Sequence, residues 1–418
     1  MQRRSLRSNS AWSLLGTIVY MGSQWGILIL LAKLGSARMV GQVALALAIS
    51  APVFFLTNLG LRQVLATDRR AEHSVRDYVK TRLWTALVGW LITVSLGGLF
   101  ASDREALYVV VWIAVAKLFE ACSDLCYGFF QRAERLDRVG QSNSTRGLAA
   151  FGMVALGLIN GLGAVSAAIG WAVGWGLVLL VFDLPLARRA LTVEGAEISA
   201  SDEAMPTKGG WQLVREALPL GIAGMWVMLN LNMPRYWLSH SHGEAALGIF
   251  AAAAYLPLGG RRVLEAIGQA ATPRMARYWA EGEWGAYRKL LLQLLVIGFA
   301  ALTAGLIVVA IFGAEILRLL YTEEYAAHAT VFTWLMLSWG LRYPGSFLTS
   351  GIIAARRFRL VAWAHFPSLL AAVTFGALLI PRYGLIGAAW ADMISASIQL
   401  VLTLFVAQRV YSRRGQPA

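Results

Sequence analysis

The chain has 418 residues, of which 58% are hydrophobic and only 14% are charged. Soluble domains usually carry about 25% charged residues, so this composition excludes an ordinary soluble protein and indicates a polytopic membrane protein. The net charge of +14 would suit a nucleic acid only if the basic residues formed one face, and they are spread along the whole chain. We therefore expect no nucleic-acid partner.

The chain begins with the basic segment MQRRSLRSNSAW, and an apolar stretch runs from Trp12 to Leu31. This stretch is long enough to cross a bilayer and another follows at once, so we expect a retained first helix rather than a signal peptide. Apolar runs of spanning length predict about 12 transmembrane helices, at 12–31, 39–60, 83–101, 107–126, 147–162, 164–184, 217–238, 245–264, 290–312, 330–351, 360–380 and 384–406.

Lysine and arginine are distributed unevenly between alternate loops of this topology. With the N-terminus in the cytoplasm, the cytoplasmic segments hold 29 of the 37 basic residues and the outer loops hold five. Because short cytoplasmic loops are enriched in Lys and Arg, this bias favours the predicted topology, with both termini in the cytoplasm. Positive charge along this rim suits anionic lipid headgroups.

A polar stretch at 185–216 is mixed in charge and poor in aromatic residues, as is typical of a flexible cytoplasmic linker. It separates an N-terminal six-helix lobe, 1–184, from a C-terminal six-helix lobe, 217–418. Two pairs of segments are similar between these halves: the runs that begin at Gly41 and Gly248, and NGLGAVSAAIGWA (160–172) with YGLIGAAWADMI (383–394). The sequence therefore predicts an all-α fold of two pseudo-symmetric lobes, with a binding site at their seam.

The segment EAIGQAATPRMARYWAEGEWGAYRK (265–289) mixes Arg, Trp and Tyr. This mixture is typical of a helix that rests on the membrane surface. The alternative is a lever that couples the eighth and ninth spans during a conformational change.

The seventh predicted span contains LNLNMPRYWLSH (229–240), which places Arg235 about 5 Å from the outer boundary. At this depth an arginine can pair with lipid headgroups by snorkelling. The alternative is a cavity-facing cation. Asn230, Asn232 and a helix kink expected at Pro234 favour the cavity, because buried amides need polar partners.

Arg342, in SWGLRYPGSF, lies about 18 Å into the tenth span, which is too deep for easy snorkelling. Intramembrane charges usually pair, so one interpretation is a buried salt bridge with Asp392 of the twelfth span. The other interpretation is a cation that faces the cavity and binds an anionic headgroup.

Lys117, Glu120 and Asp124 share one face of the fourth span. We expect Lys117 to pair with Glu120, and Asp124 to be solvated near the cytoplasmic end. The deep groups then carry one excess positive charge. Glu120 and Asp392 are candidates for a structural role or for binding a coupling ion, either a proton or sodium.

No metal site, cofactor or catalytic motif is indicated by the sequence. Cys122 and Cys126 have no histidine near them and are expected to be packing residues, and His240 and His242 are expected in an outer loop. No D-x-D motif, Walker loop or nucleophile elbow is present, so we do not expect an enzyme.

Four segments of the second half carry a family resemblance: ALPLGIAGMWVMLNLNMPRYWLSHSHGEAALGIFAAAAYL, AIGQAATPRMARYWAEGEW, FGAEILRLLYTEEYA and IPRYGLIGAAWAD. With LAKLGSARMVGQVALALAISAPVFFLTNLGLRQVLA of the first half, they resemble the oligosaccharide flippases (O-antigen type). These are the polysaccharide-transporter branch of the multidrug/oligosaccharidyl-lipid/polysaccharide exporter superfamily. The resemblance covers nearly the whole chain except 185–216.

The resemblance implies a transporter of the bacterial inner membrane that moves an undecaprenyl-diphosphate-linked oligosaccharide to the outer leaflet, for lipopolysaccharide or exopolysaccharide synthesis. Arg342 and Arg235 would hold the diphosphate, with Arg62 at the rim. A polysaccharide polymerase and a chain-length regulator would be its protein partners. A multidrug-type exporter is the first alternative, and a polytopic membrane glycosyltransferase or polymerase is the second.

Overall fold

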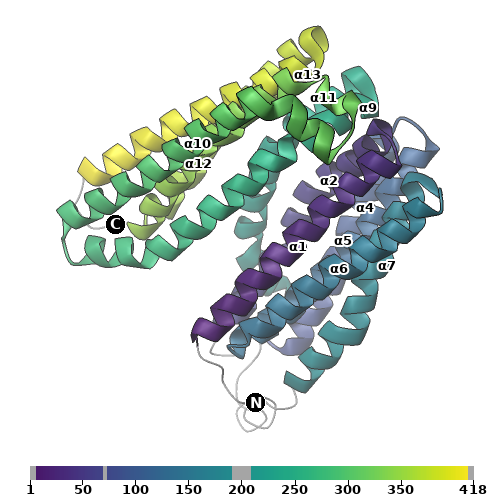
Figure 1. Cartoon of the computed structure of the whole chain (residues 1–418). Coiled ribbons are helices and arrows are strands. Elements are labelled where there is room, and N and C mark those ends of the chain that lie inside the picture. Colours follow the sequence, from purple (N-terminus) through teal and green to yellow (C-terminus); the bar gives the residue numbers. More distant parts are fainter. Residues whose placement is uncertain (1–5, 69–72, 191–208, 413–418) are drawn as a thin grey trace. The chain divides into compact units, whose positions relative to one another are not determined.

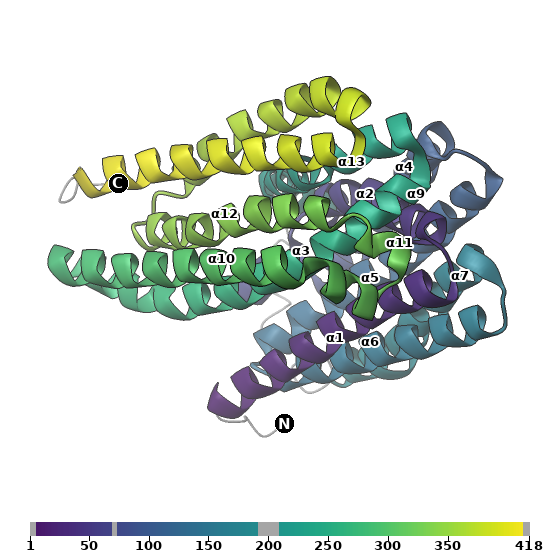
Figure 2. The same ribbon diagram turned by 45° about the horizontal axis from the view of Figure 1, so that its top comes forward.

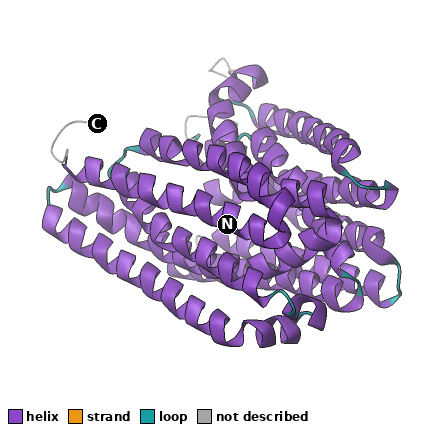
Figure 3. Ribbon diagram, turned by 90° about the horizontal axis from the view of Figure 1, so that it is seen from above, coloured by secondary structure: helices purple, strands orange, loops and turns teal. Residues whose placement is uncertain are grey.

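The computed structural model describes residues 6–68, 73–190 and 209–412, and these residues form helices joined by short turns (Figures 1 and 3). The all-helical prediction is confirmed for this part of the chain. The chain divides into two compact units, Met1–Met228 and Leu229–Ala418, which we describe separately.

Unit 1 consists of long helices whose starts are fixed by polar caps. The side chains of Ser36, Ser74 and Asp103 accept hydrogen bonds from backbone N–H groups in the first turns of three of them. The elements are α1 (Leu6–Leu34), α2 (Ala37–Asn58), α3 (Leu61–Thr67), α4 (Val75–Phe100), α5 (Arg104–Arg132), α6 (Leu136–Ile159), α7 (Gly163–Val178), the π-helical turn η1 (Leu179–Asp183) and the start of α9.

Close helix packing in unit 1 depends on small residues. Helices α1 and α6 run side by side (Figures 1 and 2) and meet at Gly16 and Gly140, where an added Cβ on either glycine would collide with the backbone of the other helix. Gly170 and Gly174 of α7 make the same kind of approach to α6. Small residues favour helix association in membranes because they let backbones come close.

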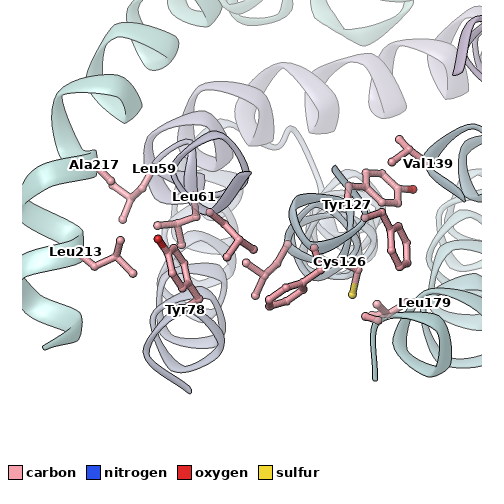
Figure 4. Close-up of a cluster of buried hydrophobic side chains, with 14 residues drawn as sticks. Leu59, Leu61, Tyr78, Cys126, Tyr127, Val139, Leu179, Leu213 and Ala217 are labelled. Carbon is pink, nitrogen blue, oxygen red and sulfur yellow. The ribbon is translucent and has the colours of Figure 1, made fainter. Parts of the chain in front are cut away.

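A cluster of buried apolar side chains joins α3, α4, α5, α6 and η1 (Figure 4). Leu213 and Ala217, from the first turns of α9, belong to the same cluster and lie beside Leu59 and Leu61. This packing explains why the boundary between the compact units falls at Met228, inside α9. Of the predicted linker at 185–216, residues 191–208 lie outside the described residues, and the lobe boundaries drawn from it stay predictions.

Unit 2 contains most of α9 (Gly210–Ala280), with α10 (Trp284–Leu320), α11 (Glu323–Ala326), α12 (Ala329–Ala354) and α13 (Phe358–Ser412). Helix α12 packs against both α10 and α13, and Figure 2 shows the three side by side.

Two glycines divide the longest helices. A straight 71-residue α9 would be on the order of 100 Å long, about three times the thickness of a bilayer core. The backbone leaves helical geometry at Gly243 (φ 78°, ψ −178°) and, in α13, at Gly384 (φ 56°, ψ −130°). Both have a positive φ, which glycine adopts without a Cβ clash. Each long helix is therefore two helices of spanning length.

All the predicted spans lie mainly on these helical segments. By length and composition, seven helices of the described chain qualify as membrane spans, so the protein is a multi-pass membrane protein. Two smaller predictions were wrong. The range 265–289 is not a separate surface helix, because α9 runs to Ala280 and α10 starts at Trp284. His240 and His242 lie in the last helical turn before Gly243 rather than in a loop.

Candidate functional site

A buried ion pair joins α12 to the second half of α13. The Arg342 Nη2 atom lies 2.9 Å from Asp392 Oδ1, and its Nη1 atom lies 3.2 Å from Asp392 Oδ2. Ser338, one helical turn before Arg342, donates from its hydroxyl to Asp392 Oδ2 at 2.6 Å. Both charged side chains are almost fully buried. Of the two interpretations of Arg342, the structure shows the salt bridge.

A second arginine approaches the same place from α9. The guanidinium groups of Arg261 and Arg342 lie 5.9 and 5.3 Å from the ring centre of Trp339, so both make cation–π contacts with one indole. Arg261 also donates to Glu265 Oε1 at 2.7 Å, and Arg262 donates to Glu265 Oε2 at 3.2 Å. A cationic cluster therefore surrounds Trp339.

The predicted asparagines of α9 are both buried, with different partners. Asn230 donates to the Ser368 hydroxyl at 2.6 Å and accepts from the Ser395 hydroxyl at 3.3 Å, which ties α9 to both halves of α13. Asn232 accepts a hydrogen bond from Arg235 Nη1 at 3.1 Å. Asn230 is thus a packing residue, whereas Asn232 orients a cation.

Arg235 lies deeper than the sequence indicates. The helix continues without a break through Pro234 to His242, so Arg235 is eight residues, or about 12 Å, before the break at Gly243. Asp392 acts on it electrostatically, although within the described chain no carboxylate forms an ion pair with Arg235. The greater depth weakens the snorkelling interpretation. Arg235, Arg342 and Asp392 therefore share one electrostatic environment in unit 2.

Unit 1 contains a separate polar cluster. Lys117 donates to Glu120 Oε2 at 2.7 Å, so the expected pair is formed, and Arg146 Nη2 lies 3.7 Å from Glu120 Oε1. The guanidinium of Arg146 is buried among the rings of Trp175, Tyr20 and Tyr127, with its central carbon 4.8, 4.9 and 5.8 Å from the ring centres. These π faces stabilise the charge where water is excluded.

Asp124, which was expected to be solvated, is partly exposed and also pairs with two arginines. Its Oδ1 atom lies 3.5 Å from Arg62 Nη1, and its Oδ2 atom lies 3.4 Å from Nη2 of the buried Arg82. Arg82 also donates to Asn58 Oδ1 at 2.5 Å. Arg62 is partly exposed, and stacks on Tyr127 with 5.4 Å to the ring centre. Arg62 is therefore held by protein groups in unit 1.

Four of the buried or half-buried charged groups that sequence reasoning missed lie in or near these clusters. Three arginines were counted among the cytoplasmic loops. Arg82 and Arg146 directly precede an apolar run and Arg261 lies near the end of one, and the helices extend beyond those runs. The fourth group, a carboxylate, was hidden inside the sixth apolar run. The four are Arg82, Arg146, Arg261 and Asp183.

The charge balance of unit 2 shows what the cluster around Trp339 can bind. Arg261 and Arg342 contact Trp339, the exposed Arg262 shares Glu265 with Arg261, and Arg235 lies within electrostatic range of Asp392. These four arginines are opposed by two carboxylates, Asp392 and Glu265, which leaves two positive charges in excess. Such an excess beside an aromatic ring favours an anion, and guanidinium groups match phosphate geometry. Within the described chain, no cluster of three metal-ligating side chains occurs, and Cys122 and Cys126 are free thiols.

The fold is similar to that of two solved membrane proteins. The structure matches an inward-facing multidrug resistance MATE family transporter with a TM-score of 0.71 and 13% identity, over 96% of this chain and 99% of the other. It matches the lipid II flippase MurJ in an inward closed conformation with a TM-score of 0.73 and 12% identity, over 97% and 89% of the two chains.

Residues 6–279 match the family model described as polysaccharide biosynthesis protein, so the chain belongs to that family and the expected resemblance is confirmed. A relative in Staphylococcus aureus, capsular polysaccharide biosynthesis protein CapF, is 25% identical over 387 residues. That alignment covers 92% of this chain and 95% of the relative.

Proposed function

We propose that the protein is a flippase, not an enzyme, and that it moves a lipid-linked oligosaccharide across the membrane for surface polysaccharide synthesis. Membership of the polysaccharide biosynthesis family supports the glycan part of this substrate. The fold supports transport, because it is shared with proteins described as a lipid II flippase and a multidrug transporter. The proposed lipid carrier is undecaprenyl diphosphate, and the proposed direction of movement is from the cytoplasmic to the outer leaflet.

The cationic cluster around Trp339 is the observation that carries the proposed substrate. A diphosphate carries negative charge and several acceptor oxygens, and hydrogen bonds between ionised partners are about twice as strong as neutral ones. Arg235 and Arg261 are the proposed diphosphate ligands, because the guanidinium of Arg342 already makes a two-point pair with Asp392.

Internal similarity supports a transport cycle of alternating access between two six-helix halves, 1–184 and 217–418. Helix α2 starts at Ala37 and the second half of α9 starts at Glu244, so Gly41 and Gly248 are the fifth residue of each. In the other repeated segment, Gly161 (φ 68°) lies in the turn between α6 and α7, and Gly384 (φ 56°) lies at the break within α13, so both have positive φ at a helix junction. Twelve spans in two pseudo-symmetric lobes follow from this proposal.

The proposed location is the inner, or plasma, membrane with both termini in the cytoplasm, as the lysine and arginine bias favours. A polysaccharide polymerase and a chain-length regulator are the proposed partners, because the exported glycan must be extended after it crosses the membrane.

The decisive experiment uses the full chain in proteoliposomes with a fluorescent undecaprenyl-diphosphate-linked oligosaccharide in both leaflets. A membrane-impermeant quencher then measures how fast lipid from the inner leaflet becomes accessible. We expect rapid exchange with the protein and little without it. Ethidium efflux in the same vesicles tests the multidrug alternative. Ethidium transport without lipid exchange would overturn the proposal.

A further inference from the structure

A buried carboxylate with no hydrogen-bond partner lies in unit 1, outside the site described above. Asp183 has 0% exposure, and neither of its oxygens has a hydrogen-bond partner in the described part of the chain. An ionised carboxylate in such a place is costly, because burial removes its hydration and no full hydrogen bond from the described chain replaces it. A neutral carboxyl would avoid most of that cost.

The backbone at Asp183 is also unusual. It is the last residue of η1, a five-residue π-helical turn that continues from α7. Single π-helical turns inside α-helices are rare and occur frequently at functional sites. The same turn contributes Leu179 to the apolar cluster, and Asp183 lies within electrostatic range of Cys126, another member of that cluster (Figure 4).

In the described part of the chain, the titratable and polar groups that act on Asp183 come from α5 and α6. The hydroxyls of Ser123 and Ser142 are close enough to the carboxylate to interact with it weakly, although neither meets the geometry of a full hydrogen bond. The Cys126 thiol, the Tyr127 phenol and the Arg146 guanidinium are also within electrostatic range. Arg146 is the one cation among these groups.

A hydrogen-bonded chain continues from these hydroxyls toward Glu120. The Tyr127 and Ser142 hydroxyls are 2.7 Å apart, and Tyr127 also donates to Asn143 Oδ1 at 3.3 Å. Arg146 Nη2 donates to the same Asn143 oxygen at 3.2 Å and lies 3.7 Å from Glu120. The Nε and Nη1 atoms of Arg146 have no hydrogen-bond partner in the described chain. The Arg146 guanidinium therefore interacts with two carboxylates, Asp183 and Glu120, and has two nitrogen atoms that donate no hydrogen bond in the described chain.

We propose that Asp183 is a proton-binding site of the transport cycle, and that Arg146, shared between Asp183 and Glu120, links proton binding to the conformation of unit 1. A hydronium ion gives its proton to the carboxylate, which leaves a neutral carboxyl and a water molecule. The guanidinium then interacts with Glu120 alone. Loss of the proton restores the competition between the two carboxylates. The transport role rests on the proposed function, whereas proton binding does not.

Infrared difference spectroscopy of the purified full chain tests proton binding without any lipid substrate. A buried carboxyl gives a carbonyl band that grows as the pH falls, and we expect Asp183→Asn to lose it. Exposed Glu105→Gln is the matched control and should retain the band. A full band in Asp183→Asn would overturn the proposal.

Because Arg146 interacts with both carboxylates, two further variants should shift the pH midpoint of the carbonyl band in opposite directions. Glu120→Gln frees Arg146 for Asp183 and should move the pH midpoint of the band down, by about one unit or more. Arg146→Gln removes the cation and should move the midpoint up by a similar amount. Unchanged midpoints in both variants would contradict the link through Arg146, even if Asp183→Asn proves too unstable to purify.

Transport assays distinguish proton coupling through Asp183 from the proposed lipid transport itself. In proteoliposomes, a pH gradient should accelerate lipid exchange by the natural chain several-fold, and Asp183→Asn should lose that acceleration. If the natural chain exchanges no lipid but keeps the titrating band, the proposed function fails and the proton site stands. If Asp183→Asn responds to the gradient like the natural chain, the coupling role of Asp183 fails.

Discussion

Arg342 and Asp392 lie 50 residues apart in sequence and meet through two parallel hydrogen bonds of 2.9 and 3.2 Å. Both are buried, and their pairing holds α12 against the second half of α13. Either residue alone would be a buried charge without a counter-ion. Their burial is tolerable because the paired geometry is nearly ideal for a guanidinium and a carboxylate.

Removing one member of this pair should lower the free energy of unfolding far more than replacing both members. We expect Asp392→Ala to cost about 3–5 kcal/mol, because it leaves Arg342 charged and unpaired. The double variant Arg342→Met, Asp392→Leu should recover most of that loss, since apolar residues of similar volume replace the pair. Thermal unfolding in detergent measures both effects. A double variant as unstable as Asp392→Ala would show that the pair is not an isolated unit.

Arg235 should act on transport rather than on stability. Its hydrogen-bond partner is the neutral Asn232, and a charged hydrogen bond to a phosphate is worth about 1.5–3 kcal/mol. We therefore expect Arg235→Gln to slow lipid exchange in proteoliposomes by about tenfold to about a hundredfold, and Arg235→Lys to slow it less. Exposed Arg288→Gln is the control and should exchange lipid normally. Normal exchange by Arg235→Gln would remove Arg235 from the proposed ligands.

Any residue other than glycine at the Gly243 break should destabilise the protein. Its φ of 78° and ψ of −178° lie in a region that is essentially restricted to glycine, where side chains cost about 1–3 kcal/mol. We expect Gly243→Ala to lower the free energy of unfolding by that amount. Gly259 lies in the same helix with open space around its Cα, so Gly259→Ala should be neutral or stabilising by up to about 1 kcal/mol. Equal stabilities of the two variants would contradict the strain argument.

The helices could be predicted from the sequence because a run of about 20 apolar residues identifies a spanning helix without knowledge of the tertiary fold. It also gave the Lys117–Glu120 pair, since residues three apart on a helix are neighbours by geometry alone. It proposed Asp392 as a partner for Arg342 by a general rule that buried charges pair.

Helix ends were the main source of error. Polar residues such as Arg146 and Arg261 mark the edge of an apolar run, yet the helices continue past them and the tertiary fold buries them. Similarly, Arg235 was placed too near the surface because the apolar run stops at Leu238 while the helix does not. The end of an apolar run therefore does not mark the end of the helix that contains it.

The closest helix crossing in unit 1 gives a final prediction. An added Cβ on Gly140 would collide with the Trp12 carbonyl, and α1 and α6 would have to move apart along their length. We expect Gly140→Ala to cost about 1–3 kcal/mol, as overpacking does in a tight core. Gly152, on the same helix, has open space, so Gly152→Ala should be neutral or slightly stabilising. Thermal unfolding of both variants measures the difference, and a stable Gly140→Ala protein would mean that the two helices pack less closely than described.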